Sequence, residues 1–206
     1  MFSDIVIPKN NEAEFIQIAS RLSIKKLIFL YELDEFNEEK LQKKMQSIDN
    51  KKINVEIGII ANQKNLNKAA KLSKLLFVKS SDKDRFFIES KKIKIIYGFE
   101  ETFKKDYLHH RASGLNQTIG EMGRKYDVHF GFSYGSLLNN TNQITSVILG
   151  RMMQNIRICQ KYKVKTVIGS FSDKPYGMRA QHDVISLFSI LGMDGKNTKN
   201  SLDYDL

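Results

Sequence analysis

Residues 26–31 read Lys-Leu-Ile-Phe-Leu-Tyr, a run in which every residue after the lysine is apolar or aromatic. Strands with one solvated face alternate apolar and polar side chains, whereas parallel strands covered by helices on both faces are apolar along most of their length. Six other segments share this composition and are predicted to be strands: residues 2–7, 53–61, 75–79, 93–99, 128–134 and 166–171. Together these runs predict a parallel sheet.

Amphipathic segments separate the predicted strands. Residues 11–22 begin with an asparagine suited to cap a helix, carry two glutamates in the first turn, and place apolar side chains at helical spacing. Six further segments are predicted helices: residues 34–48, 69–72, 82–90, 113–126, 142–162 and 181–191. This alternation predicts an α/β chain, and periodicity alone leaves open whether its sheet is doubly wound or a closed barrel.

The chain is expected to form one domain with a short tail. Residues 1–194 hold all the predicted strands and helices, and this length is enough to bury a sizeable core. Residues 195–206 begin with a glycine and are mostly polar, so we expect them to form a flexible C-terminal tail.

The chain is basic. Its 206 residues include 33 Lys and Arg against 23 Asp and Glu, a formal net charge of +10 that favours polyanions such as nucleic acid or an anionic membrane surface. Charge alone is a weak indication, because many basic proteins have other functions. Five of the seven arginines lie in the second half, and residues 128–172 contain no acid. Because the planar guanidinium suits phosphate, the second half is the expected polyanion-binding part.

Several protein classes are excluded by the sequence. Cys159 is the only cysteine, so a secreted disulfide scaffold is excluded, and we expect a cytoplasmic protein. Residues 1–4 carry no basic segment followed by an apolar run, so we expect no signal peptide. Residues 128–150 contain no Asp, Glu, Lys or Arg, but they include many hydroxyl and amide side chains whose burial in lipid would cost too much, so we expect no membrane partner.

No catalytic residue and no metal site are predicted in the chain. Its four histidines are His109, His110, His129 and His182. The first two are adjacent and would diverge on any regular element, which does not suit metal binding. Cys159 falls on the apolar side of a predicted helix, where a core role is usual. The chain also has no P-loop, dinucleotide-binding fingerprint or nucleophile elbow.

Two segments concentrate groups that suit an anion. Residues 104–116 bring basic and aromatic side chains to the predicted start of a helix, where free N–H groups favour phosphate. They are equally compatible with a solvated loop that has one capping serine. Residues 170–179 follow the carboxyl end of a predicted strand, the edge at which α/β folds place their sites. They combine hydroxyl groups with Lys174 and Arg179, although Asp173 is also compatible with a simple turn cap.

The same segments carry a resemblance to a known family. The matching stretches are residues 106–116 (Asp-Tyr-Leu-His-His-Arg-Ala-Ser-Gly-Leu-Asn), 131–133 (Gly-Phe-Ser), 150–162 (Gly-Arg-Met-Met-Gln-Asn-Ile-Arg-Ile-Cys-Gln-Lys-Tyr), 169–172 (Gly-Ser-Phe-Ser) and 178–179 (Met-Arg). In order and spacing they resemble the ribonuclease P protein component 3 family, the archaeal relative of the eukaryotic thirty-kilodalton ribonuclease P subunit. The resemblance runs from a first strand with Asp4 to residue 193, and its motifs are specific in the second half. Ala112 and Tyr134-Gly135 depart from the family pattern.

The resemblance implies a fold and a role. The fold is a seven-stranded TIM-like barrel akin to the polymerase-and-histidinol-phosphatase fold, without its metal-binding histidines. The role is that of a protein subunit of ribonuclease P, the particle that removes the 5′ leader of precursor tRNA and in which the RNA, with magnesium, performs the cleavage. The implied partners are the ribonuclease P RNA, precursor tRNA through the particle, a small ferredoxin-like protein subunit and other protein subunits. No cofactor is expected on the chain itself.

Basic groups of the second half supply the candidate site. On the predicted helix 142–162, Arg157 and Lys161 share one face while Arg151 and Asn155 share another, so either pair suits a phosphate backbone. The predicted RNA-binding or partner-facing residues are Lys105, His109, His110, Arg111, Arg151, Arg157, Ser170, Ser172, Lys174 and Arg179. A structural role is the alternative for Arg151, which borders the apolar stripe. A metal-dependent phosphoesterase of the same barrel type and a generic RNA-binding module are the alternative functions.

Overall fold

The computed structural model describes residues 2–37, 39, 41, 53–101, 105, 106 and 108–203. Its strands are β1 (Ser3–Val6), β2 (Lys26–Glu32), β3 (Asn54–Ile60), β4 (Leu76–Lys79), β5 (Ile95–Tyr97), β6 (His129–Ser133) and β7 (Thr166–Gly169). Its α-helices are α1 (Glu12–Arg21), α3 (Leu66–Leu72), α4 (Asp84–Glu89), α5 (Gln117–Lys125), α6 (Gly135–Leu138), α7 (Asn142–Tyr162), α8 (Gln181–Ile190) and α9 (Gly195–Leu202). Two 3-10 turns are η1 (Phe99–Glu101) and η2 (Pro175–Gly177). Most of the predicted helix at 34–48 lies outside the described residues.

The strands form one parallel sheet in which each pairs with the next in chain order. The two end strands also meet. Val6 forms a bridge with Ser172, whose carbonyl accepts the Ile7 N–H at 2.9 Å, and the Phe171 N–H donates to the Ile5 carbonyl at 2.7 Å. These contacts close the sheet into a barrel, which excludes the doubly wound alternative. The predicted seven-stranded barrel is confirmed.

Apolar side chains fill the inside of the barrel. The inner cluster contains Ile5, Ile28, Leu30, Ile60, Phe77, Ile95, Tyr97 and Val167. At the carboxyl ends of the strands, the Phe171 ring stacks on Tyr97 with centroids 4.4 Å apart and an interplanar angle of 9°. Phe171 has a left-handed backbone with φ of 46°, which costs a residue other than glycine about 1–2 kcal/mol. The two rings therefore close the carboxyl end of the interior.

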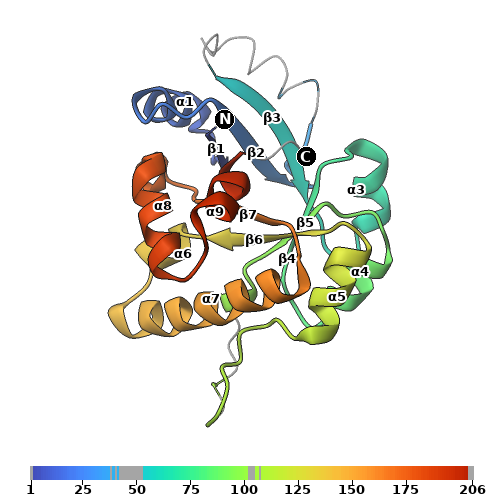
Figure 1. Ribbon diagram of the computed structural model, residues 1–206. Coiled ribbons are helices and arrows are strands. Elements are labelled where there is room, and N and C mark those ends of the chain that lie inside the picture. Colours follow the sequence, from blue (N-terminus) through green and yellow to red (C-terminus); the bar gives the residue numbers. More distant parts are fainter. Residues whose placement is uncertain are drawn as a thin grey trace.

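Helices surround the barrel and bury a second, larger apolar layer against its outer face (Figure 1). The fully buried aromatic side chains of this layer are Phe15, Phe29, Phe99, Phe130, Phe132 and Phe188. Helix α7 runs along the lower edge of the barrel in Figure 1. It is 21 residues long and buries Ile148, Met152 and Ile156. Its other faces carry exposed and half-buried polar residues, among them Gln154 and Arg157.

The structure corrects three details of the sequence analysis. Helix α5 starts at Gln117 and not at residue 113, because the Asn116 side chain accepts the Ile119 N–H at 2.9 Å and caps the helix there. Gly135 opens the short helix α6, which the sequence did not predict. Residues 195–202, expected in a flexible tail, form α9. Asp194 caps this helix and Leu202 is fully buried, so the segment is part of the domain.

Candidate nucleic-acid interface

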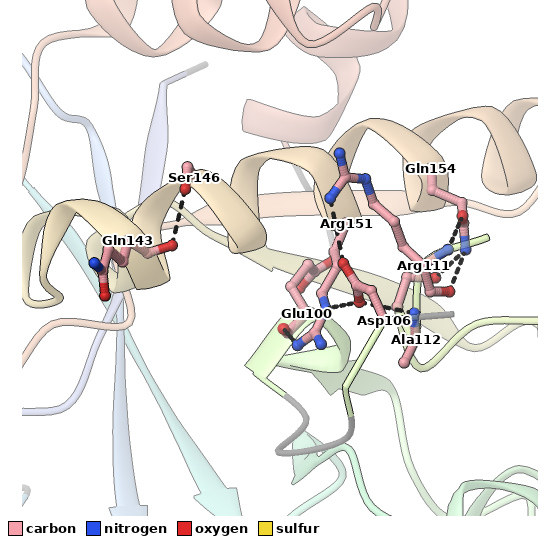
Figure 2. Close-up of polar contacts among 9 residues, drawn as sticks. Glu100, Asp106, Arg111, Ala112, Gln143, Ser146, Arg151 and Gln154 are labelled. Atoms are coloured by element: carbon pink, nitrogen blue, oxygen red, sulfur yellow. Dashed lines mark hydrogen bonds and ion pairs between the residues drawn. The ribbon is translucent and has the colours of Figure 1, made fainter. Parts of the chain in front are cut away.

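One carboxylate, Asp106, organises the loop that precedes α5. Its Oδ1 accepts the Ala112 N–H at 2.9 Å and Arg151 Nε at 2.9 Å, and its Oδ2 accepts Arg111 Nη1 at 3.2 Å (Figure 2). Desolvation alone would raise the pKa of Asp106, but the bonds from Ala112, Arg151 and Arg111 outweigh it and hold this pKa below its usual value. The carboxylate therefore stays charged and ties two arginines and the loop backbone together.

Arg151 has a structural position. Only 6% of its side chain is exposed, and its Nη1 donates to the Glu100 carbonyl at 3.0 Å in addition to the Nε bond with Asp106. A planar guanidinium with both ends engaged joins helix α7 to the turn η1 and to the loop. The structure thus places Arg151 beneath the surface, in agreement with the alternative that the sequence left open for it.

Two amides on α7 fasten the same loop. Gln154 Oε1 accepts the Arg111 N–H at 3.2 Å, and its Nε2 donates to the Arg111 carbonyl at 3.0 Å and to Ser113 Oγ at 2.6 Å. Asn155 Nδ2 donates to the Ser113 carbonyl and to Glu100 Oε1, both at 2.8 Å. Burial raises the pKa of Glu100 to about 7, although the Asn155 bond opposes the shift. One face of α7 therefore holds the loop backbone on both sides of Ala112.

The loop before α5 and helix α7 form a basic groove of about 380 Å³, which we call the α7 groove. It is lined by Arg111, Gly150, Met153, Gln154, Arg157, Ile158 and Lys161. Gly150 makes room for the Arg111 side chain. A Cβ at position 150 would lie 2.3 Å from Arg111 Cζ and 2.6 Å from Nε and Nη2. These short distances show that the guanidinium lies against the helix backbone at Gly150, so that any larger residue there would displace it.

The α7 groove is strongly positive. Three of its seven lining residues are cationic and none is acidic. Arg111 shares Asp106 with Arg151, whereas Arg157 and Lys161 form no ion pair within the part of the chain that the structure describes. Both are exposed. Cations that converge without carboxylate partners attract phosphate.

The loop beyond the groove projects from the body of the molecule, below α7 in Figure 1. Lys105, His109 and His110 are exposed there, as predicted for a contact surface. Leu108 is 91% exposed. The structure thus presents these predicted residues to solvent, next to the α7 groove that Arg111 lines.

The second predicted segment is divided by the barrel closure. Ser170 is fully buried and its Oγ donates to the Ile5 carbonyl at 3.1 Å, while Ser172 is 2% exposed and its Oγ donates to the Lys174 carbonyl at 3.0 Å. Neither hydroxyl reaches a partner surface, so the prediction for these two serines does not fit the structure. They lie where β7 meets β1, a contact that local sequence does not reveal. Lys174 is exposed, and its contact with RNA or a partner stays a prediction.

A buried carboxylate holds this closure and the loop above it. Asp4 Oδ1 accepts the Ser170 N–H at 2.6 Å, and its Oδ2 accepts Tyr134 Oη at 2.8 Å, which in turn accepts the Arg179 N–H at 3.3 Å. Burial raises the pKa of Asp4 to about 6. The Arg179 side chain is partly exposed, and its Nη1 donates to the Tyr176 carbonyl at 2.7 Å. Arg179 is therefore fixed beside the loop, and among the described residues no hydrogen bond or ion pair joins it to the α7 groove.

The described residues contain neither a metal-binding cluster nor a membrane-spanning helix. No three His, Cys, Asp or Glu side chains in that part of the chain lie close enough to share a metal ion. No helix there is both long and apolar enough to cross a bilayer.

Sequence reasoning did not assign Gly150, Met153 or Gln154 to a site, and it noted Lys161 only as a neighbour of Arg157. A signal for these residues was present. Positions 150, 154, 157 and 161 follow helical spacing, so they share one face of a helix. The partner of that face, Arg111, is 39 residues away from Gly150 in the sequence, and this pairing appears only in the fold.

Comparison with known proteins identifies the family of the chain and several relatives. A family model described as RNase P subunit p30 matches residues 1–205. Ribonuclease P protein component 3 of Methanococcus maripaludis strain C5 is 27% identical over 156 residues, which are 73% of this chain and 66% of the relative. The protein of the same name from Thermococcus kodakarensis is 27% identical over 139 residues, 66% of this chain and 60% of the relative. The chain thus matches less than two thirds of the length of these relatives.

Solved structures establish the fold. A chain of the cryo-EM structure of archaeal ribonuclease P with mature tRNA superposes with a TM-score of 0.81 at 17% identity, covering 97% of this chain and 86% of that one. The crystal structure of an uncharacterized protein gives a TM-score of 0.58 at 5% identity, covering 98% and 71%. The barrel resembles the polymerase-and-histidinol-phosphatase fold, as expected. With a family model that matches nearly its whole length, the chain belongs to the RNase P subunit p30 family.

Proposed function

We propose that this chain is a protein subunit of ribonuclease P that binds the catalytic RNA and supports removal of the 5′ leader from precursor tRNA. Family membership supports this role, as does the fold shared with a chain of an archaeal ribonuclease P particle. The observation that carries the proposal is the α7 groove, in which Arg111, Arg157 and Lys161 converge with no acidic residue in the lining. Such a surface suits the phosphates of RNA.

The chain acts as a scaffold in this proposal. Cleavage is assigned to the RNA and its magnesium, and the chain supplies no catalytic group and binds no cofactor of its own. The stacked rings of Tyr97 and Phe171 support this view, because they fill the carboxyl end of the barrel, where α/β barrels place their active sites. We place the assembled particle in the cytoplasm.

A protein partner is part of the proposal. Leu138, Ile144 and Val147 lie at the end of α6 and in the first turns of α7, and are 46%, 48% and 36% exposed. The surrounding residues 128–150 contain no Asp, Glu, Lys or Arg. An apolar, uncharged surface of this kind suits a protein neighbour better than RNA. We assign it to the small ferredoxin-like subunit, with the other protein subunits joining through the assembled particle.

Reconstitution tests the proposed function. Ribonuclease P RNA and the remaining protein subunits are assembled with and without this chain, and single-turnover cleavage of precursor tRNA is measured at fixed magnesium concentration. We expect the chain to raise the rate or to lower the magnesium needed, and to produce no phosphate ester hydrolysis alone. Equal cleavage with and without the chain contradicts the role and leaves a generic RNA-binding module. Metal-dependent hydrolysis by the isolated chain would instead identify a phosphoesterase.

A further inference from the structure

We propose that the α7 groove accepts one unpaired nucleotide of the RNA, with its base against Met153 and Ile158 and its phosphates on the cations, and does not track the backbone of a duplex. This inference rests on the proposed function, which requires only that the chain binds RNA. It adds the structural state of the RNA segment that the groove recognises.

The lining of the groove has two chemical parts. Arg111, Arg157 and Lys161 provide positive charge, whereas Met153 and Ile158 provide apolar surface. A duplex presents phosphates and sugars to a protein and keeps its bases stacked inside. The apolar surface beside the cations would therefore have no base to contact in a duplex. An unpaired nucleotide presents both a phosphate and an apolar base face, and thus matches both parts.

The shape of the groove fits the same ligand. A volume of about 380 Å³ lies at the small end of the range for pockets that hold single small molecules. One wall is the Arg111 guanidinium, which Asp106 and the space at Gly150 hold against α7. Its side chain is still 47% exposed. A guanidinium plane fixed on one side and open on the other is a stacking surface for a base.

The groove offers little for reading base identity. Gln154 is its only amide, and both ends of that amide are engaged: Oε1 accepts the Arg111 N–H, while Nε2 donates to the Arg111 carbonyl and to Ser113 Oγ. The remaining polar groups of the lining are cations, which favour phosphate. Recognition therefore depends on stacking and charge, and tolerates different bases.

The test compares pairing states at constant sequence. A fluorescein-labelled RNA of about 12 nucleotides, within the site sizes of single-strand-binding proteins, is titrated with the full chain by fluorescence anisotropy, first alone and then annealed to its complement. The variant Met153→Ala removes apolar surface without changing charge. Its matched control is Met122→Ala, which removes a half-buried methionine of α5 that does not line the groove. Met153→Leu restores apolar volume, and thermal melting checks that each variant is folded.

We expect Met153→Ala to weaken binding of the single strand by at least about fivefold, to leave duplex binding within about twofold, and to be rescued by Met153→Leu. Met122→Ala should change neither affinity. Equal loss for both RNAs, or no loss for either, overturns the inference and assigns the groove to the backbone alone. If Met153→Ala is unstable, the unmodified chain is crosslinked instead to a single strand that contains 4-thiouridine. The inference expects crosslinked peptides within residues 150–161, and the absence of any crosslink there overturns it. The proposed function has a separate test: it fails if reconstituted ribonuclease P cleaves equally well without this chain.

Discussion

Replacing Arg151 by methionine tests whether α7 holds the loop that carries Arg111. The substitution keeps an apolar stem of similar length and removes a guanidinium that is 6% exposed. Among the described contacts, the substitution removes a hydrogen bond to the Asp106 carboxylate at 2.9 Å and one to the Glu100 carbonyl at 3.0 Å. The guanidinium donor is charged in both bonds, and bonds of this kind contribute about 2 kcal/mol each, so we expect the free energy of unfolding to fall by about 4 kcal/mol.

The same substitution should loosen the loop before it unfolds the domain. Asp106 keeps its bonds from the Ala112 N–H and from Arg111, so the carboxylate is not left alone. One of its three tethers is nevertheless gone, and hydrogen exchange at the Ala112 amide should become faster than exchange in the barrel strands. Mass spectrometry of a peptide that covers residues 105–116 measures this difference.

The matched control is Arg157→Met on the same helix. Arg157 is exposed and forms no ion pair within the described residues, so its replacement should change the free energy of unfolding by no more than about 0.5 kcal/mol. Urea denaturation of the two variants and the unmodified chain gives the comparison. A loss below about 1 kcal/mol for Arg151→Met, or equal losses for both variants, would refute the idea that Arg151 organises the loop.

Three further predictions concern single residues. Gly150→Ala should weaken RNA binding without changing net charge, because the new methyl group displaces the Arg111 guanidinium; unchanged affinity in an anisotropy titration contradicts this. Burial raises the pKa of Glu100 to about 7, so the folded chain keeps a proton that the unfolded chain loses, and its stability falls as pH rises from about 4.5 to about 7. Glu100→Gln removes this loss and should be more stable than the unmodified chain by about 3 kcal/mol at pH 8. Equal urea midpoints of the two proteins at pH 8 argue against this prediction. Leu202→Ala should lower the free energy of unfolding by about 2–5 kcal/mol, since α9 buries this side chain fully, and thermal melting measures the loss. An unchanged melting temperature would indicate that residues 195–202 form a loose tail after all.

The barrel was predictable from sequence because its signals are local. Parallel strands buried on both faces leave continuous apolar runs, and all seven predicted strands are present. Helix α7 matches its predicted range of 142–162 because a long amphipathic segment defines itself over several turns. The prediction of a flexible C-terminal tail was wrong, also for a local reason. Gly195 suggested a break, whereas Asp194 caps a helix there and Leu202 anchors it in the core.

The candidate site was only partly predictable because it depends on contacts between distant residues. Arg111 and Arg157 were chosen for charge, and the structure brings them together in one groove. Arg151 has the same charge but faces Asp106 and the interior, and sequence cannot separate it from Arg157 without the partner of each helix face. Ser170 and Ser172 were chosen for their position after a strand, but closure of β7 against β1 buries both.

The central claim is that the α7 groove grips RNA through its three cations. The most direct measurement is the salt dependence of the dissociation constant for ribonuclease P RNA, compared between two triple variants. One replaces Arg111, Arg157 and Lys161 by alanine. The other replaces the exposed Lys64, Lys68 and Lys71, in and just before α3, and so removes the same charge elsewhere.

Each phosphate contact contributes about 0.7 to the slope of log Kd against log salt for single-stranded RNA. We therefore expect the slope to fall by about 2 for the groove variant and to stay near that of the unmodified chain for the α3 variant. Equal slopes in the two variants would show that RNA binding depends on the net charge of the chain and not on the position of the cations, and would contradict the account.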